Sequence, residues 1–226
     1  MDKPPQPAAQ QPRSVRFSMR SLLLVVLVVA LVCGNLASLL RLRSAETELA
    51  QLRGEVGYLG EHAADRIVAV RLAAEQPLLW RLRVRVPKTG RYRLAYSAIW
   101  PADTAQPEWF SAVPLQPGES VVTVQIAPDP RDDQWKMSVL ARHATGSRRM
   151  ASTLAEPLTI VFRGSHEVLR AGIGTTATAV GPEQSIRLIE DRWMVGEGAQ
   201  LLYGAAPPDQ DQPGVYLELQ PDTAPL

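Results

Sequence analysis

The sequence predicts a mainly β protein, in which an N-terminal transmembrane helix continues into a short helical stalk and is followed by a β-sandwich or jelly-roll-like domain. Two observations predict this class. Residues 22–40 carry no charge, and a helix of that length reaches nearly across the roughly 30 Å hydrocarbon core of a bilayer. From residue 66 onward, short alternating segments recur between turns rich in Pro, Gly and Asp, which is typical of sandwiches and jelly rolls.

These observations divide the chain into four segments. Residues 1–20 form a basic tail with too few apolar side chains to pack, so we expect this tail to be disordered and cytoplasmic. Residues 21–40 form the transmembrane helix, and residues 41–63 form the helical stalk. Residues 64–226 form the β-sandwich domain, and this segment is long enough to bury a sizeable core.

The apolar run favours a retained anchor over a cleaved signal peptide. A signal peptide has an apolar region of about 7–15 residues that ends at a small-residue cleavage site. The run here is longer, and its candidate cleavage positions, Gly34 and Ala37, lie inside it. We therefore expect a single-pass signal-anchor, with a secreted β-domain protein as the alternative.

The flanking charges bear on orientation. Three arginines lie close to each end of the run, so the positive-inside rule alone does not decide which end faces the cytoplasm. The short N-terminal tail is basic, and Asp2 is its only acidic residue. This excess of positive charge favours a cytoplasmic N-terminus and an extracytoplasmic β domain. With 21 arginines and three lysines, the composition is typical of a GC-rich bacterial genome. We therefore expect the chain in the inner membrane of a bacterium.

The segment after the span carries the apolar spacing of a coiled coil. Its apolar residues recur at alternating spacings of three and four, which predicts a parallel homodimer; they are Leu42, Ala45, Leu49, Leu52, Val56 and Leu59. Gly54, Gly57 and Gly60 oppose a helix there, at roughly 1 kcal/mol each relative to alanine. These glycines favour a monomeric amphipathic stalk, and the homodimer is the alternative.

The β domain is expected to contain short strands throughout. The two most regular ones, Trp80–Val86 and Arg91–Trp100, flank the turn residues 87–90 and predict a hairpin. The other expected strands are residues 67–72, 109–113, 120–126, 135–142, 158–163, 167–170, 175–180, 185–189, 200–203 and 215–219. Trp80 and Trp100 lie on the apolar faces of their strands, whereas Trp109 lies between turns and is expected to be exposed.

The most distinctive surface feature of the predicted hairpin is a series of arginines. Arg81, Arg83 and Arg85 alternate on one face of the first strand, with Arg91 and Arg93 on the returning strand. Guanidinium groups arranged in this way bind anionic partners, such as an acidic glycan, lipid headgroups or an envelope protein. The interpretation that we favour is a solvated face that discourages edge pairing, and binding of an anionic partner is the alternative.

No motif indicates catalysis, a metal or a cofactor. His62, His143 and His166 lack metal-ligand spacing, and Cys33 is the only cysteine. The glycines at 172 and 174 match a dinucleotide loop only loosely, and residues 209–214 depart from a calcium loop. We expect a non-catalytic protein. The alternative is an envelope hydrolase that uses loop carboxylates, which leave no local signature.

The charge balance argues against a nucleic-acid partner. The whole chain carries a formal net charge of +1, and its basic excess lies in the first 60 residues. Nucleic-acid-binding domains usually present a strongly basic face. The expected partners are instead the lipid bilayer, a second copy of the chain, and an anionic glycan or envelope protein.

Three segments together resemble a known group of proteins. They are Arg16-Phe-Ser-Met-Arg-Ser-Leu-Leu23, Trp80-Arg-Leu-Arg-Val-Arg-Val-Pro87 and Gly90-Arg-Tyr-Arg-Leu94. They look like segments of uncharacterised single-pass membrane proteins of planctomycete-type bacteria, in which a basic-aromatic segment precedes the anchor. A β-rich domain with a tryptophan-arginine strand follows the anchor in that group. The resemblance covers about 40 residues. It implies export and an extracytoplasmic β domain, and no activity.

Overall fold

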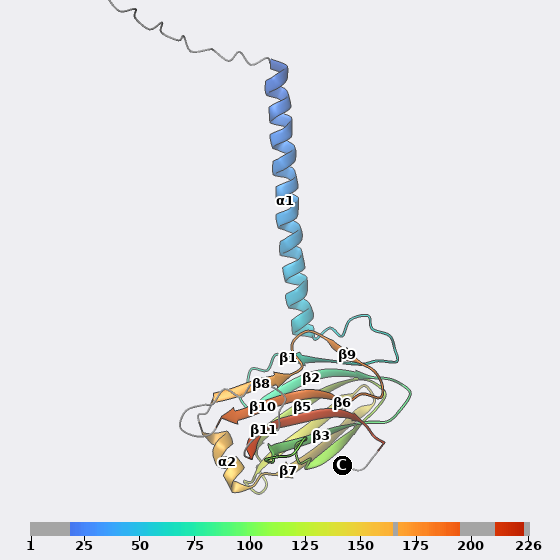
Figure 1. Cartoon of the computed structure of the whole chain (residues 1–226), viewed down its shortest axis with the longest axis vertical. Coiled ribbons are helices and arrows are strands. Elements are labelled where there is room, and N and C mark those ends of the chain that lie inside the picture. The colour runs from blue at the N-terminus through green and yellow to red at the C-terminus, as the bar shows by residue number, and fades with distance from the viewer. Residues whose placement is uncertain (1–18, 165–166, 195–210, 224–226) are drawn as a thin grey trace, which may run out of the picture. The chain divides into compact units, whose positions relative to one another are not determined.

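The computed structural model describes residues 19–164, 167–194 and 211–223 (Figure 1). The predicted tail lies almost entirely outside these residues, and the expected strand at 200–203 lies wholly outside them. The chain forms two units, residues 1–50 and residues 51–226.

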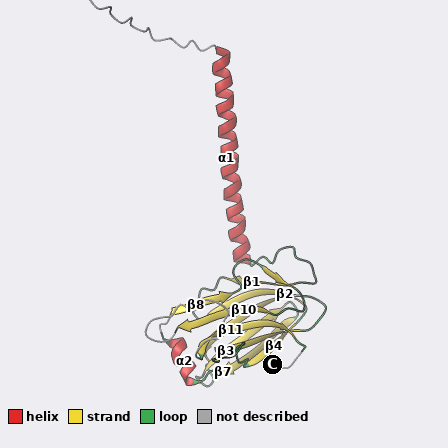
Figure 2. Ribbon diagram, viewed as in Figure 1, coloured by secondary structure: helices red, strands yellow, loops and turns green. Residues whose placement is uncertain are grey.

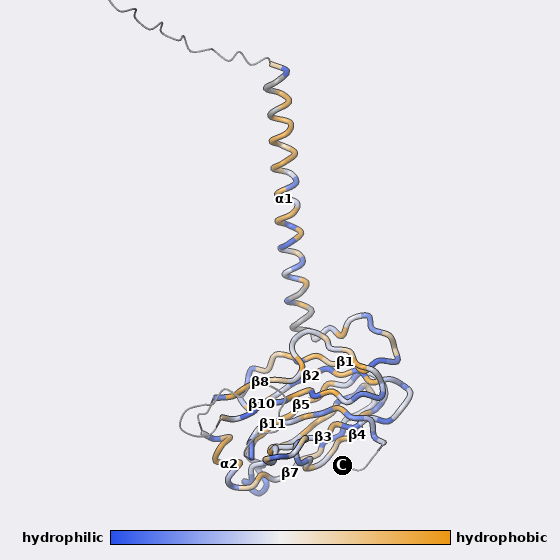
Figure 3. The backbone as a smooth tube through the Cα atoms, viewed as in Figure 1, coloured by the Kyte–Doolittle hydropathy of each residue, from blue (hydrophilic) through white to orange (hydrophobic). Residues whose placement is uncertain are grey.

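The N-terminal element is one long apolar helix, α1 (Met19–Val56). Its stretch Val26–Leu49 has a mean hydropathy of 1.8 over 24 residues, which is long and apolar enough to cross a membrane, although a signal sequence would have the same properties. Figure 3 shows hydrophobic residues along much of α1. The polar side chain of Asn35 donates to the Leu31 carbonyl oxygen at 3.1 Å, which satisfies one of its donors within the helix. The apolar helix is thus confirmed, while insertion, orientation and the type of membrane remain predictions.

The helix ends earlier than predicted. Gly57, at φ +66°, takes the left-handed conformation that commonly terminates a helix, and residues 58–60 are not helical. Leu59, the last position of the predicted coiled-coil pattern, is buried against Val68 and Val70 of β1 (Ile67–Leu72). The helix therefore stops short of residue 63, the predicted end of the stalk, and Leu59 packs with the β domain. The coiled coil itself remains a prediction.

The β domain consists of two antiparallel sheets (Figure 2). In spatial order, the six-stranded sheet contains β7 (Gly146–Thr153), β6 (Trp135–His143), β5 (Gly118–Pro128), β2 (Leu79–Val86), β1 and β9 (Thr178–Val180). The five-stranded sheet contains β4 (Ser111–Leu115), β3 (Tyr92–Trp100), β11 (Gln212–Pro221), β10 (Ile186–Met194) and β8 (Glu167–Gly172). A short helix, α2 (Glu156–Arg163), follows β7 in the chain. The mainly β class is confirmed, and the jelly-roll arrangement remains a prediction.

One hydrophobic core is shared by the two sheets. Leu82 of β2 and Val139 of β6 contribute to it from the six-stranded sheet, and Leu94 of β3 and Leu217 of β11 contribute from the five-stranded sheet. All four side chains are completely buried. Burial stabilises the fold by about 1.5–3 kcal/mol for each large aliphatic side chain. The alternation seen in the sequence is therefore the alternation between this core and solvent.

The predicted hairpin between residues 80–86 and 91–100 does not form. Strand β2 pairs with β1 and β5, whereas β3 pairs with β4 and β11. The turn residues 87–90 instead carry the chain from one sheet to the other. Both strands have an apolar face, and two facing sheets bury these faces against the same core.

The segment predicted as a strand at residues 158–163 is helix α2. Pro157 stands in its first turn, where a missing N–H costs nothing, and Glu156 and Arg163 complement the helix dipole. The side chain of Phe162 is buried and packs edge-on against Trp193, with ring centroids 5.0 Å apart. The sequence pattern missed β7 altogether. The other predicted strands within the described residues each overlap a strand of the structure.

Candidate functional site

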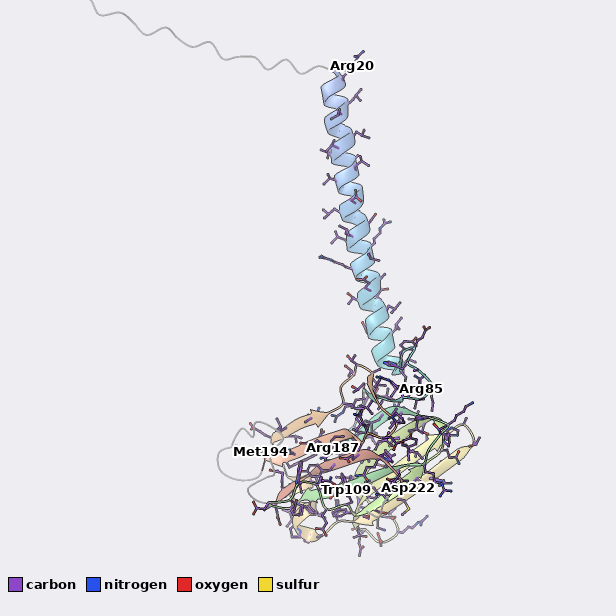
Figure 4. The ribbon with its side chains drawn as sticks, turned by 45° about the vertical axis from the view of Figure 1, so that its right-hand side comes forward. Arg20, Arg85, Trp109, Arg187, Met194 and Asp222 are labelled. Atoms are coloured by element: carbon purple, nitrogen blue, oxygen red, sulfur yellow. The ribbon has the colours of Figure 1, made fainter. Side chains whose placement is uncertain are left out.

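The three arginines of β2 point out from the core. Arg81, Arg83 and Arg85 alternate with buried residues along the strand, Arg81 being exposed and the other two half-buried. One guanidinium nitrogen of Arg85 donates to the His62 carbonyl oxygen at 3.3 Å (Arg85 is labelled in Figure 4). The predicted arginine series on β2 therefore lies on the outer face of the six-stranded sheet.

The two remaining predicted arginines do not join this face. Arg93 lies on β3 of the other sheet, where it donates to Gln220 at 3.4 Å and pairs with Asp222 at 3.3 Å. Arg91 is exposed and precedes β3. The five arginines were expected together because of the predicted hairpin, and the crossing between sheets separates them.

Two arginines that sequence reasoning missed do lie on the outer face with those of β2. Across the sheet, Arg83 is in register with Val121 and then with Arg142 of β6. One row further, Arg81 is in register through β5 and β6 with Arg149 of β7. Residues in register point to the same side, and neighbouring strands lie about 4.8 Å apart. Arg81, Arg83, Arg142 and Arg149 form the basic sheet face.

The basic sheet face carries charge that no direct ion pair compensates among the described residues; Glu119 of β5 lies on the same face, in register with Arg85. Arg81, Arg142 and Arg149 are exposed. Within the described ranges, none of its four arginines forms an ion pair. An exposed guanidinium without a carboxylate partner keeps its donors available for an external anion.

A hollow of about 740 Å³ lies at one end of this face, beneath the turn after β5. Its lining includes Gln125, Asp129, Arg131, Lys136 and Arg149. The Lys136 ammonium pairs with Asp129 at 2.8 Å and with Asp132 at 2.6 Å. Hydrogen bonding from Lys136 lowers the pKa of both carboxyl groups, so they stay ionised and, with that lysine, form a cluster of net charge −1. Arg131 and Arg149 add two positive charges, so these five groups together carry a net charge of +1.

A second pocket surrounds a buried carboxylate. Asp191 of β10 is 1% exposed and points toward the six-stranded sheet. It accepts hydrogen bonds from Arg71 of β1 at 2.9 and 3.3 Å, and from the indole Nε1–H of Trp80 at 2.7 Å. The guanidinium Nε of Arg170, on β8, lies 3.9 Å from the same carboxylate. These contacts connect the two sheets through one buried charge.

This Asp191 pocket has a volume of about 560 Å³. Its apolar lining includes Leu78, Val168, Trp80 and Trp193, and the two indole rings meet edge-on with centroids 6.1 Å apart. The sequence carried a signal for Asp191, because it alternates with Ile189 and Trp193 on the core-facing side of its strand. An acid on such a face indicates a buried ion pair.

A third polar group lies on the outer side of the five-stranded sheet. Arg187 pairs with Glu218 at 2.8 Å and with Glu190 at 3.4 Å, and Arg192 pairs with Glu190. The Arg187 guanidinium also lies 5.6 Å from the centre of the Trp109 ring (both residues are labelled in Figure 4). Trp109 was predicted to be exposed, but its side chain is half-buried. Each of the two arginines has a carboxylate partner, so this group has less free charge than the basic sheet face.

The residues considered for metals and cofactors do not converge. His62 contacts the Leu59 carbonyl oxygen at 2.7 Å, and the ring of His143 contacts Thr145 at 3.1 Å. Across the ranges that the structure describes, no three His, Cys, Asp or Glu side chains could together hold a metal ion. His166 and residue 209 lie outside the described residues. Gly172 ends β8 in a left-handed conformation, which fits a turn.

No protein-family model matches the chain, and no curated protein matches it in sequence. The function must therefore be inferred from the geometry of these sites.

Proposed function

We propose that this protein is a membrane-anchored, non-catalytic component of a bacterial envelope, whose β-sandwich binds an anionic glycan through the basic sheet face. In this proposal α1 crosses the inner membrane, the N-terminus is cytoplasmic and the β domain is extracytoplasmic. The single observation that carries the proposal is the row of arginines on the outer face without carboxylate partners in the described part of the chain.

The arrangement of the arginines supports a polymeric ligand. They occur on three strands, β2, β6 and β7, so the charge extends across the sheet rather than converging on one point. Guanidinium forks bind carboxylate and sulfate groups with two parallel hydrogen bonds. The hollow beside Arg149 supports a glycan over a lipid surface, because one acidic sugar unit can enter a concavity that a flat bilayer cannot fill.

The carboxylates that line these two hollows support a binding role over hydrolysis. Glycosidases of the usual kind need two carboxylates on opposite sides of the scissile bond. Among the described residues, the hollow beside Arg149 is lined by one carboxylate, Asp129, and the Asp191 pocket by one, Asp191. Both carboxylates are already paired with cations.

Self-association through α1 is a further part of the proposal. Leu42, Leu49 and Leu52 are 46–60% exposed and follow the heptad spacing. A second copy would cover these side chains where they lie outside the bilayer.

Charge reversal on the basic sheet face is expected to abolish glycan binding. We expect Arg83→Glu with Arg149→Glu, in the full chain in nanodiscs of neutral lipid, to weaken binding of polygalacturonate at least about tenfold, because two charge-assisted contacts become repulsive. The control is Arg163→Glu on α2, an exposed position of another element, and its charge change is matched by each of the single variants Arg83→Glu and Arg149→Glu.

Biolayer interferometry at two salt concentrations measures this effect, and wild-type binding should weaken at higher salt. Equal losses for the α2 control would contradict the assignment to this face. Binding to phosphatidylglycerol vesicles without binding to polygalacturonate would replace the glycan with a lipid surface.

The proposed orientation is tested by protease accessibility. We expect protease added to spheroplasts to degrade the β domain, because the short basic tail retains the N-terminus in the cytoplasm. Immunoblotting with an antibody against the β domain measures the result, and a cytoplasmic protein serves as the control for intact membranes. Full protection of the β domain would overturn the orientation.

A further inference from the structure

We propose that the Asp191 pocket is a binding site for a small organic anion with an apolar body. The pocket lies between β1 and β2 of one sheet and β8 and β10 of the other. None of its lining residues belongs to the basic sheet face, so this proposal does not rest on glycan binding.

The size and lining of the pocket suit a small molecule. A volume of about 560 Å³ falls within the usual range of ligand pockets, roughly 300–1,000 Å³. Leu78, Leu79 and Val168 provide apolar walls beside the edges of the two indole rings. Such a site buries an apolar body and fixes its orientation with few polar groups.

The charges of the pocket select the sign of the ligand. Asp191 and Arg71 compensate one another within the site. Arg170 is the remaining cation, and its side chain is 74% exposed and 3.9 Å from the Asp191 carboxylate. The lining groups therefore carry a net charge of +1, from two arginines and one aspartate.

The position of Asp191 also orients the ligand. A buried carboxylate repels a second anion, so the charged group of the ligand stays at the exposed guanidinium of Arg170. The apolar body then extends inward along Leu78 and Val168. An uncharged analogue of the same shape loses the contact with Arg170.

A strained residue in the lining supports a ligand site independently. Leu78 has φ +56°, a left-handed conformation that is costly for a bulky side chain. It is held there because its carbonyl oxygen accepts the Ile126 N–H at 3.0 Å and its side chain packs on the core. Backbone strain of this kind persists where the surrounding structure enforces it, and it concentrates at ligand sites.

Fluorine NMR of para-fluorobenzoate with the full chain in nanodiscs tests the proposal. We expect line broadening beyond that caused by empty nanodiscs, and much weaker broadening with para-fluorobenzamide, its uncharged analogue. Arg170→Ala should weaken benzoate binding at least about tenfold, because a charge-assisted hydrogen bond is lost. Arg170→Lys should retain part of the binding, and Thr175→Trp, which places a large ring at the exposed rim, should block it.

The matched control is Arg163→Ala, which removes an exposed arginine from α2 without touching the lining. Circular dichroism confirms that each variant retains its strands. Equal broadening by the amide, unchanged binding in Arg170→Ala, or no broadening by the wild-type chain would each overturn the proposal. Loss of polygalacturonate binding in the charge-reversal variant would leave this result unaffected, so the two proposals fail separately.

Discussion

Replacing Asp191 with alanine is expected to lower the free energy of unfolding of the β domain by about 3–5 kcal/mol. The carboxylate is 1% exposed and accepts hydrogen bonds from Arg71 and Trp80. Without it, the Arg71 guanidinium, with 18% of its side chain exposed, remains as an uncompensated and largely buried charge. Because these contacts connect strands of both sheets, their loss also separates elements that are far apart in the chain. Chemical denaturation followed by tryptophan fluorescence measures the change.

A double-mutant cycle separates the ion pair from the rest of the site. Arg71→Met alone leaves Asp191 buried with the Trp80 N–H as its hydrogen-bond donor and the exposed Arg170 at 3.9 Å, so we expect a loss of about 3–5 kcal/mol here as well. Combining Arg71→Met with Asp191→Ala removes both charges, and the remaining deficit is expected to be about 1–3 kcal/mol, for the Trp80 N–H left without an acceptor.

The exposed partner of Arg93 provides the control for this cycle. Asp222 has 39% of its side chain exposed, so Asp222→Ala should change stability by less than about 1 kcal/mol. Single variants at Asp191 and Arg71 whose losses simply add in the double variant would show that the two charges do not stabilise one another. That result would contradict the coupling between the sheets.

The fold class could be predicted because it depends on which face of each strand is apolar. Trp80, Leu82 and Val84 alternate with arginines, and this alternation persists in the structure as core and solvent. Strand partners depend on more than this pattern. Strands β2 and β3 could bury their apolar faces equally well as neighbours in one sheet or as members of two facing sheets. The structure has them in two facing sheets.

Short segments were the other source of error. Residues 158–163 contain β-branched and aromatic residues, which are typical of strands, yet Leu158, Val161 and Phe162 also follow helical spacing. Pro157 and Glu156 were the signals for a helix start. Strand β7 escaped prediction because most of it is exposed at the edge of its sheet, and it lacks an apolar face.

The candidate sites could not be predicted from the sequence, because each site joins residues that are far apart along the chain. Asp191 lies 120 residues from Arg71 and 111 residues from Trp80 in the sequence. An acid on a core-facing strand position indicates that a partner exists, and only the arrangement of the sheets identifies that partner. The same holds for the basic sheet face, because Arg142 and Arg149 join Arg81 and Arg83 through strand order.

Gly172 provides the second large expected effect. Its φ of +93° is unfavourable for any side chain, and a Cβ there would lie 2.7 Å from the Leu188 carbonyl oxygen. That oxygen belongs to the backbone of β10 at the register shift between Arg187 and Ile189, and it also accepts the Ile173 N–H at 3.2 Å. The oxygen therefore cannot move away without disturbing the pairing of β8 with β10. We expect Gly172→Ala to cost about 2–5 kcal/mol, from backbone strain together with overpacking.

Gly174→Ala is the matched control, two residues further along the chain. The nearest atom to a Cβ at Gly174 is the Thr176 backbone nitrogen, at 4.0 Å, which is ordinary van der Waals contact. Alanine there should be neutral, or should stabilise the domain by about 0.4–1 kcal/mol because it restricts the unfolded chain. Thermal unfolding measures both variants. Equal stability of the two would mean that β8 relaxes away from β10 at this point, and the close approach at Leu188 would then not constrain the edge of the five-stranded sheet that holds Arg170.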